Sequence, residues 1–202
     1  MNTYRLPIPA ENRPLSLQGE GFELRVQTLE DAEADYRTVM ANREHLRAWC
    51  ADTWPEDDFT LEQNRQDLRD HIGDAEEGFA YGYTVWEPAT TIVLGSVYLY
   101  PSAYFADRYQ LTVEQRSALE KAVVLVDYWL GEDLERSRLH GEFARALRTW
   151  LGDQWGYRYA AWATRPPMDS RRELYDQLGF SFLGMAESVH TPGWFQAWHL
   201  SE

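Results

Sequence analysis

The chain has 202 residues, and its 33 acidic and 19 basic side chains give a formal net charge of −14. A chain of this length fits one domain, or one domain with an arm, and can bury a core of its own. The acidic balance argues against nucleic acid and against an anionic membrane surface as partners, because both repel negative charge. It suits either a site for cationic amines or a surface that keeps the protein soluble.

Cys50 is the only cysteine, which excludes a disulfide within the chain and is typical of a reducing compartment. Residues 1–14 lack the apolar core that a signal peptide needs. No apolar run approaches the roughly 20 residues of a membrane-spanning helix. We therefore expect a cytoplasmic protein.

The N-terminal half opens with a proline-rich segment and continues with helix and strand patterns. Three prolines within residues 1–21 predict an extended N-terminal arm, so a single domain is expected over 22–202. Thr28 before an acidic turn and Thr60 before a polar run are typical helix starts. The predicted elements are a strand at 22–27, helices at 28–41, 42–50 and from 60 to about 73–78, strands at 78–87 and 91–100, and a hairpin turn at 88–90.

The C-terminal half is centred on an apolar, β-branched run at 121–130, which is typical of a central strand. Ser170 and Glu173 match a capping box, and Gly179 is placed to end the helix that this box would begin. The remaining predicted elements are a helical turn at 112–119, helices at 133–152 and 170–178, and strands at 157–164, 180–189 and 194–200. The whole order predicts an α/β (α+β) fold with one mixed sheet of about seven strands and helices on both faces.

Four segments resemble the GCN5-related N-acetyltransferases (GNAT), and in particular the branch that acts on ribosomal proteins and polyamines. The segments 24–32 and 42–49 look like the opening of that branch. The run 128–130 is similar to its fourth strand, and the run 174–180 (LYDQLGF) is similar to its LYEKLGF signature. The likeness covers roughly residues 22–185.

This resemblance implies a fold in which the fourth and fifth strands splay apart. It also implies that the pantetheine arm of acetyl-CoA, the co-substrate, lies between them like an added strand. The coenzyme diphosphate would lie at the N-terminus of the next helix. The acceptor would be a primary amine, of a small molecule or of a protein N-terminus, that attacks the thioester directly. A backbone N–H near Tyr128, Trp129 and Leu130 would bind the thioester oxygen.

The turn after the predicted fourth strand departs from the family pattern, which has small residues where the backbone closes on the phosphates. Two alignments of this stretch are open, and neither restores the glycines. One interpretation is an ordinary helix with an acidic first turn. The other is that arginine side chains replace contacts that glycines allow in the family. The residues expected to bind the coenzyme here are Arg136, Arg138, Leu139, His140 and Gly141, although His140 also fits a position on the surface of the helix.

Two residues are candidates for proton transfer. Tyr175 matches the family tyrosine that faces the coenzyme sulfur, and a phenol can protonate a leaving thiolate; packing within a helix is the alternative. Asp127 interrupts an otherwise apolar strand, where an unpaired carboxylate costs several kcal/mol. We expect Asp127 to act as a base through water, and an ion pair with an arginine is the alternative.

Trp49, Trp54 and Asp58 lie in the segment that forms the acceptor wall in this family, and such side chains suit a cation. They equally suit a solvated loop. No spacing of histidines or carboxylates indicates a metal site. Two rival hypotheses stay open: a catalytically inactive relative that binds a ligand or a protein, and transfer of a bulkier acyl group. The sequence is also compatible with a homodimer.

Overall fold

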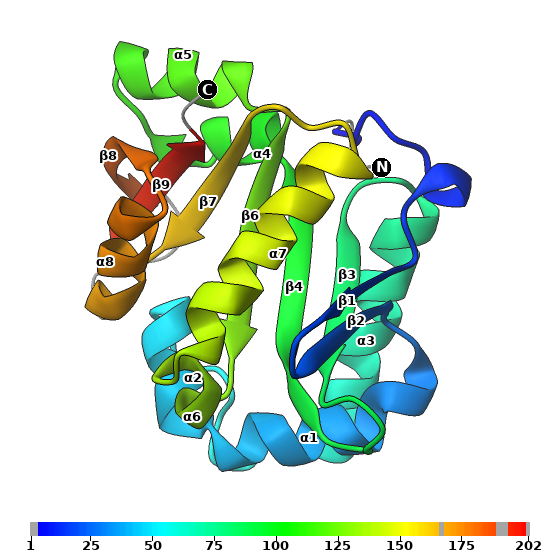
Figure 1. Cartoon of the computed structure of the whole chain (residues 1–202). Helices are drawn as coiled ribbons and strands as arrows, with labels where there is room; N and C mark the ends of the chain where they lie inside the picture. The colour runs from blue at the N-terminus through cyan, green and yellow to red at the C-terminus, as the bar shows by residue number, and fades with distance from the viewer. Residues whose placement is uncertain (1–3, 166–167, 189–193, 201–202) are drawn as a thin grey trace.

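The computed structural model describes residues 4–165, 168–188 and 194–200, and these form one mixed sheet with helices packed around it (Figure 1). The strands are β1 (Ser16–Gly19), β2 (Phe22–Val26), β3 (Tyr81–Trp86), β4 (Val93–Pro101), β5 (Tyr109–Gln110), β6 (Val124–Leu130), β7 (Ala160–Thr164), β8 (Phe180–Ser188) and β9 (Trp194–Leu200). The α-helices are α1 (Ala32–Ala41), α2 (Arg43–Cys50), α3 (Leu61–Glu76), α4 (Ser102–Ala106), α5 (Val113–Lys121), α6 (Glu132–Glu135), α7 (Leu139–Asp153) and α8 (Asp169–Gln177). Two short 3-10 helices are η1 (Ala10–Asn12) and η2 (Leu29–Asp31).

The sheet confirms the predicted fold class. Its strand order is β1-β2-β3-β4-β6-β7-β9-β8-β5, and every neighbouring pair is antiparallel except β6 and β7, which are parallel. All seven predicted strands are present. The two further strands are β1, which lies within the predicted arm, and the two-residue β5, which lies within the long connection after β4.

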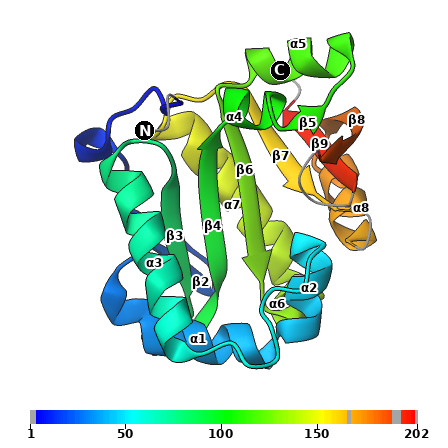
Figure 2. The same cartoon turned by 180° about the vertical axis from the view of Figure 1, so that it is seen from behind.

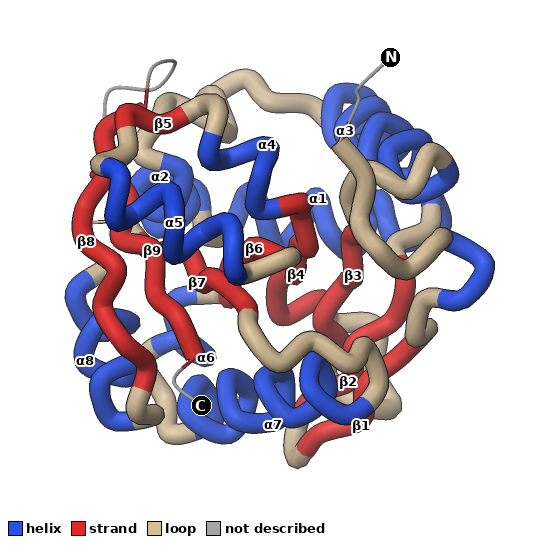
Figure 3. The backbone as a smooth tube through the Cα atoms, turned by 90° about the horizontal axis from the view of Figure 1, so that it is seen from above, coloured by secondary structure: helices blue, strands red, loops and turns tan. Residues whose placement is uncertain are grey.

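Helices cover both faces of the sheet, as expected. Helix α7 crosses one face in front of β4 and β6 (Figure 1), whereas α3 and α1 lie on the opposite face (Figure 2). The view from above shows the sheet between α7 and α3 (Figure 3). The apolar stripe of α7 is fully buried because Phe143, Leu147 and Trp150 pack into the main core.

Local signals predicted the starts of two helices correctly. Thr28 forms a capping box with Asp31, in which the Thr28 N–H donates to the Asp31 carboxylate. Thr60 does the same with Gln63 at the start of α3. Each box satisfies backbone donors that have no partner within the helix.

Three predicted elements were wrong in detail. The predicted helix 133–152 is two helices, α6 and α7, because Ser137 interrupts it: its hydroxyl donates to the Leu134 carbonyl and accepts the Leu139 N–H. Helix α8 has Met168 at its N-cap, so Ser170 lies inside the helix and the predicted capping box does not form. Helix α5 extends to Lys121, which shortens the following strand to β6.

Strands β6 and β7 part after a short paired stretch, as the family resemblance implied. They pair only from Val124–Ala160 to Val126–Trp162, whereas β6 stays paired with β4 as far as Leu130. The C-terminal half of β6 therefore has one edge that β7 does not cover. No helix in the described part of the chain is long and apolar enough to cross a membrane.

Candidate functional site

The opening between β6 and β7 is lined by the backbone of Tyr128, two residues beyond the last paired residue of β6. Its N–H donates to the carboxylate of Asp127 at 3.0 Å, and its carbonyl accepts from Arg171 at 2.6 Å. These are the polar groups that would bind an arm inserted between the strands. Side chains of the protein itself therefore hold both of them.

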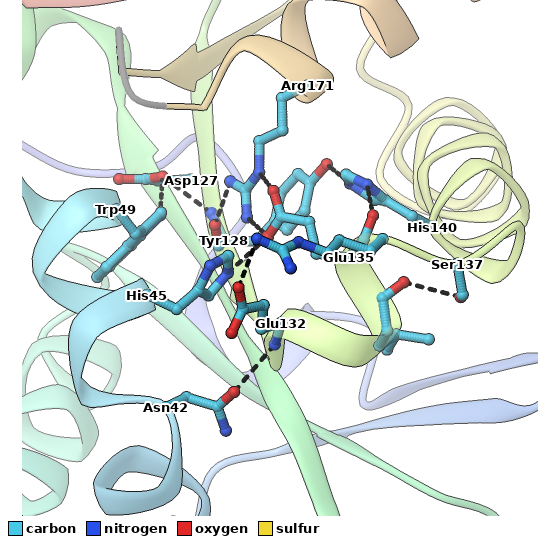
Figure 4. A network of polar contacts seen from close by, with 12 residues as sticks. Asn42, His45, Trp49, Asp127, Tyr128, Glu132, Glu135, Ser137, His140 and Arg171 are labelled. Carbon is cyan, nitrogen blue, oxygen red and sulfur yellow. Dashed lines mark hydrogen bonds and ion pairs between the residues drawn. The ribbon is translucent and has the colours of Figure 1, made fainter.

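Arg171, on α8, is fully buried and ion-paired with Glu135, at the end of α6 (Figure 4). Its Nε and Nη2 donate to the two carboxylate oxygens at 2.5 and 2.7 Å. The guanidinium carbon also lies 4.2 Å from the centroid of the Tyr128 ring. His45, on α2, completes the cluster because its Nε2 lies 3.1 Å from Glu135 Oε2.

The charges in this cluster support one another. Burial would raise the pKa of Glu135, but the positive charge of Arg171 and hydrogen bonds from His45 and Arg171 hold it well below its usual range. Burial would lower the pKa of Arg171, and the Glu135 carboxylate raises it instead. Both groups are therefore charged at neutral pH, in the two-bond geometry that strengthens arginine–carboxylate pairs.

His140 is 4% exposed, so the expectation of a position on the helix surface was wrong. Its Nδ1 lies 3.0 Å from the Glu135 carbonyl, and its Nε2 lies 2.8 Å from the Tyr128 hydroxyl. Because a carbonyl oxygen only accepts, Nδ1 carries the proton and Nε2 accepts from the tyrosine. Burial and the nearby charge of Arg171 lower the pKa of His140 to about 4, so the ring is neutral at pH 7.

Asp127 is buried in an ion pair with Arg165, with 2.9 Å between Oδ2 and Nη2. Its Oδ1 also accepts the Tyr128 N–H and the Trp49 indole N–H, the latter at 3.2 Å. The Arg165 guanidinium carbon lies 4.8 Å from the centroid of the Trp49 ring. The structure thus contains the ion pair with an arginine that was the alternative interpretation of Asp127. The role of Asp127 as a base stays a prediction.

The turn between α6 and α7 uses backbone donors that a diphosphate would need. The N–H groups of Leu139 and His140 donate to the hydroxyl and the carbonyl of Ser137, at 3.1 and 3.2 Å. Arg136 is exposed and paired with Glu132 at 2.6 Å. Arg138 is also exposed and has no ion-pair partner among the described residues. Of the two arginines expected to bind the coenzyme, Arg138 is the one left available for an anion.

Tyr175 lies in the core behind the opening, with no exposed surface. Its ring packs against Trp162 and Phe180, with centroids 5.8 and 5.2 Å apart, and its side chain interacts with that of Tyr128. Burial raises the pKa of its hydroxyl well above the usual value, so it stays protonated. This protonation state suits a proton donor, but the donor role stays a prediction.

The other predicted site residues occupy two regions. Leu130 is buried at the end of β6, and Gly141 is the third residue of α7. Trp129 faces the α3 side and, with Trp49 and Trp54, lines a separate cavity. Asp58 is exposed and does not line that cavity in the described part of the chain. The predicted coenzyme residues are therefore divided between the two sides of β6: Tyr128 packs on the α7 side, whereas Trp129 shares its cavity with the predicted acceptor residues Trp49 and Trp54.

Four residues were not predicted to belong to the site: Arg171, Glu135 and His45 of the buried cluster, and Ser137 of the turn between α6 and α7. For Arg171 and Glu135 the only sequence signal is charge, because Arg171 lies one turn before Tyr175 in the LYDQLGF helix and Glu135 lies among three other acids near the turn. Pairing between residues 36 positions apart has no periodic pattern that would reveal it.

The fold is that of the GCN5-related N-acetyltransferases, as the comparisons with solved structures establish. RimL, a ribosomal L7/L12 α-N-protein acetyltransferase in complex with coenzyme A, matches with a TM-score of 0.67 and 15% identity, over 92% of this chain and 97% of that chain. RimJ of Mycobacterium smegmatis in complex with CoA-disulfide matches with a TM-score of 0.69 and 12% identity, over 95% and 88%. A ribosomal-protein-S5-alanine acetyltransferase from Vibrio fischeri matches with a TM-score of 0.66 and 17% identity, over 93% of this chain and 96% of that chain. No protein-family model and no curated protein matches the sequence.

Proposed function

We propose that the protein is an acetyl-CoA-dependent N-acetyltransferase that acts on a primary amine. The observation that carries this proposal is the parting of β6 and β7 beyond Val126 and Trp162, in a fold shared with acetyltransferases that bind coenzyme A. The resemblance in sequence supports it at Tyr175. Two of the similar solved structures are named as acetyltransferases of ribosomal proteins, which supports a protein N-terminus as a candidate acceptor, and a small amine is the other candidate.

The coenzyme arm fits this opening only if Arg171 releases the Tyr128 carbonyl. Arg171 keeps its two bonds to Glu135 in that event and loses one hydrogen bond to a neutral acceptor. A hydrogen bond that involves a charged group contributes about 1.5–3 kcal/mol. We therefore expect acetyl-CoA to bind roughly tenfold to a hundredfold more weakly than it would to an open site.

Acetyl-CoA supplies the acyl group and a thiolate leaving group. In this proposal the Tyr128 N–H binds the thioester oxygen, which requires Asp127 to retain only its contacts with Arg165 and Trp49. The amine nitrogen forms a bond to the acyl carbon as the carbon–sulfur bond breaks. The ammonium loses one proton to water before the attack. A second proton passes from the nitrogen through water to Asp127, and one passes from Tyr175 to the thiolate; exchange with solvent then takes the proton from Asp127 and returns one to Tyr175.

Isothermal titration with acetyl-CoA at concentrations up to about 1 mM tests the binding step. The wild-type protein should bind weakly, and the double variant Arg171→Met/Glu135→Gln should bind at least about tenfold more tightly, because Tyr128 is released without leaving a buried charge. Glu135→Gln alone keeps Arg171 at the carbonyl, and because it leaves the Arg171 charge without a counterion, its thermal unfolding is measured to verify that it is folded. Absence of binding by both the wild type and the double variant would reject the proposal.

A second candidate function is a non-catalytic domain that binds a ligand or a partner protein. It is favoured by one observation, which is that Arg171 and Ser137 already hold backbone groups that the coenzyme would need. An assay of thiol release from acetyl-CoA with a panel of amines distinguishes the two candidates. Release above the rate without protein rules out the non-catalytic domain, whereas coenzyme binding without release favours it.

A further inference from the structure

A cavity of about 270 Å³ lies on the α3 side of the sheet, away from the Arg171–Glu135 pair. Its walls come from α1, α2, α3, β4 and β6. This volume lies just below the range of about 300–1,000 Å³ that is usual for small-molecule sites, and it suits a compact group.

The cavity wall carries negative charge and no positive charge. The carboxylates of Asp35, Asp52 and Asp67 line it, and none of the described lining residues is Lys or Arg. Burial raises the pKa of Asp35 to about 6, and a hydrogen bond of 3.0 Å from the Asn64 amide limits the rise. The Asp35 carboxylate is therefore mostly ionised at pH 7, with a neutral donor but no cationic partner in the wall. An ionised group this buried favours a positively charged occupant.

His71 adds an acceptor to the same wall. Its Nδ1 is buried and bonded to no group in the part of the chain that the structure describes. Its ring meets that of Tyr98 edge-on, with centroids 5.0 Å apart. Burial lowers the pKa of His71 to about 4, so the ring is neutral at pH 7 and offers one unprotonated nitrogen. A primary ammonium has three N–H donors, which matches two carboxylates and one imidazole nitrogen.

Aromatic and aliphatic side chains form another part of the wall, beside the polar Asp52 and Asn64. Tyr98, Tyr100 and Trp129 contribute rings, and Val39 and Leu68 contribute aliphatic surface. Such surface binds the hydrocarbon body of a ligand, and ring faces also attract cations. A strongly hydrated polar molecule would gain little from these side chains.

One residue joins this cavity to the opening between β6 and β7. Trp49 lines the cavity, and its indole N–H donates to Asp127, whose Oδ1 also accepts the Tyr128 N–H. A ligand in the cavity is therefore separated from the opening by Trp49 and Asp127. The cavity therefore adjoins Asp127, the residue proposed to take up the proton of the amine.

We propose that the cavity binds a compact primary amine with an aromatic or branched apolar body, held through its ammonium by Asp35, Asp67 and His71. As the acceptor, this amine gives the proposed acetyltransferase its substrate class; that role rests on the proposed function. The binding itself does not, because it needs no coenzyme.

Titration of the full-length protein with 2-phenylethylamine, without acetyl-CoA, tests the inference, and 2-phenylethanol is its neutral counterpart. The amine should bind at least about tenfold more tightly than the alcohol, because only the amine pairs with the carboxylates. Asp67→Asn should weaken binding of the amine about tenfold. Glu76→Gln is the control, since Glu76 is exposed on the same helix and does not line the cavity; it should change binding less than about twofold. Thermal unfolding of each variant verifies that it is folded.

Equal affinities for the amine and the alcohol, or equal effects of the two variants, would overturn the inference. That outcome leaves the proposed function intact if thiol release still occurs with another amine. Conversely, selective binding of 2-phenylethylamine with no thiol release from acetyl-CoA would reject the acetyltransferase while the cation site stands.

Discussion

Arg171 and Glu135 join α8 to α6 across the opening between β6 and β7, through two hydrogen bonds of 2.5 and 2.7 Å. The pair is buried, and Glu135 is shared with His45. Each charge is therefore stabilised by its partner and not by water. This dependence makes the pair the feature whose removal has the largest expected effect on both stability and coenzyme binding.

Removing either member alone should destabilise the fold strongly. Arg171→Leu or Glu135→Leu each leaves an uncompensated buried charge, which costs about 3–5 kcal/mol of unfolding free energy. The double variant Arg171→Leu/Glu135→Leu should lose much less than the sum, because neither charge remains. Urea denaturation of the four proteins measures the coupling, which we expect to exceed about 1 kcal/mol.

The surface pair Arg145–Glu142, at 3.3 Å, serves as the control for that cycle. Both side chains are about half exposed, so solvent screens their attraction, and Arg145→Ala should change the unfolding free energy by less than about 1 kcal/mol. Additive effects of the Arg171 and Glu135 substitutions would contradict the paired arrangement.

Stability should fall as the pH is lowered from about 6.5 to 4 in part because of His140. Its pKa in the folded protein is about 4, below the value of 6.5 expected when it is unfolded, so unfolding takes up a proton in this window. The contribution of neutral His140 to the free energy of unfolding is complete above pH 6.5 and is lost by about pH 4. It amounts to about 3 kcal/mol at most. His140→Gln should flatten this part of the curve of unfolding free energy against pH.

His71 also has a folded-state pKa of about 4, so part of the slope remains in His140→Gln. Two-dimensional NMR of the histidine rings checks both values directly. Neither His71 nor His140 should titrate above pH 5, and a midpoint near 6.5 for His140 would refute its buried neutral state.

Arg138→Ala should weaken acetyl-CoA binding about threefold to tenfold without altering the fold, because Arg138 is exposed and free to contact a phosphate. The control is a titration of Arg145→Ala with acetyl-CoA. This variant also loses one arginine charge, but Arg145 is already paired with Glu142. If the dissociation constant is the same in Arg138→Ala as in the wild type, Arg138 does not belong to the site.

Tyr175→Phe should lower kcat about tenfold to a hundredfold and leave the affinity for acetyl-CoA nearly unchanged, since only the proton donor is lost. The phenyl ring keeps its packing against Trp162 and Phe180. Steady-state kinetics of thiol release measure the effect, and urea denaturation separates it from a loss of stability. Reduced stability with unaltered kcat would mean that Tyr175 serves packing alone.

Signals confined to a few neighbouring residues predicted much of the fold. The capping boxes at Thr28 and Thr60, and the helix stop at Gly179 with its φ of 75°, depend on contacts within one turn. The splayed strands followed from the family resemblance and not from periodicity. The spacing of apolar residues predicted a single helix over 133–152. It gave no sign that the Ser137 hydroxyl ends α6 and begins α7.

The candidate site was less predictable because its contacts join distant parts of the chain. Glu135 and Arg171 are 36 residues apart, and His45 and Glu135 are 90 apart. The burial of His140 depends on its bond to the Tyr128 hydroxyl, which no spacing rule indicates. Asp127 stood out as a charge in an apolar strand, but its partner Arg165 came only with the structure.

The sheet ends in two short strands, β1 with four residues and β5 with two. An edge strand offers unpaired N–H and C=O groups to which another chain can add, and short edges limit that offer. β5 pairs with β8 through Tyr109 and Gln110 and so shields part of an otherwise longer border. Intermolecular sheet extension, a common route to aggregation and to swapped assemblies, is therefore limited to four residues at the β1 border, whereas β5 covers only the last two of the nine residues of β8 at the other border.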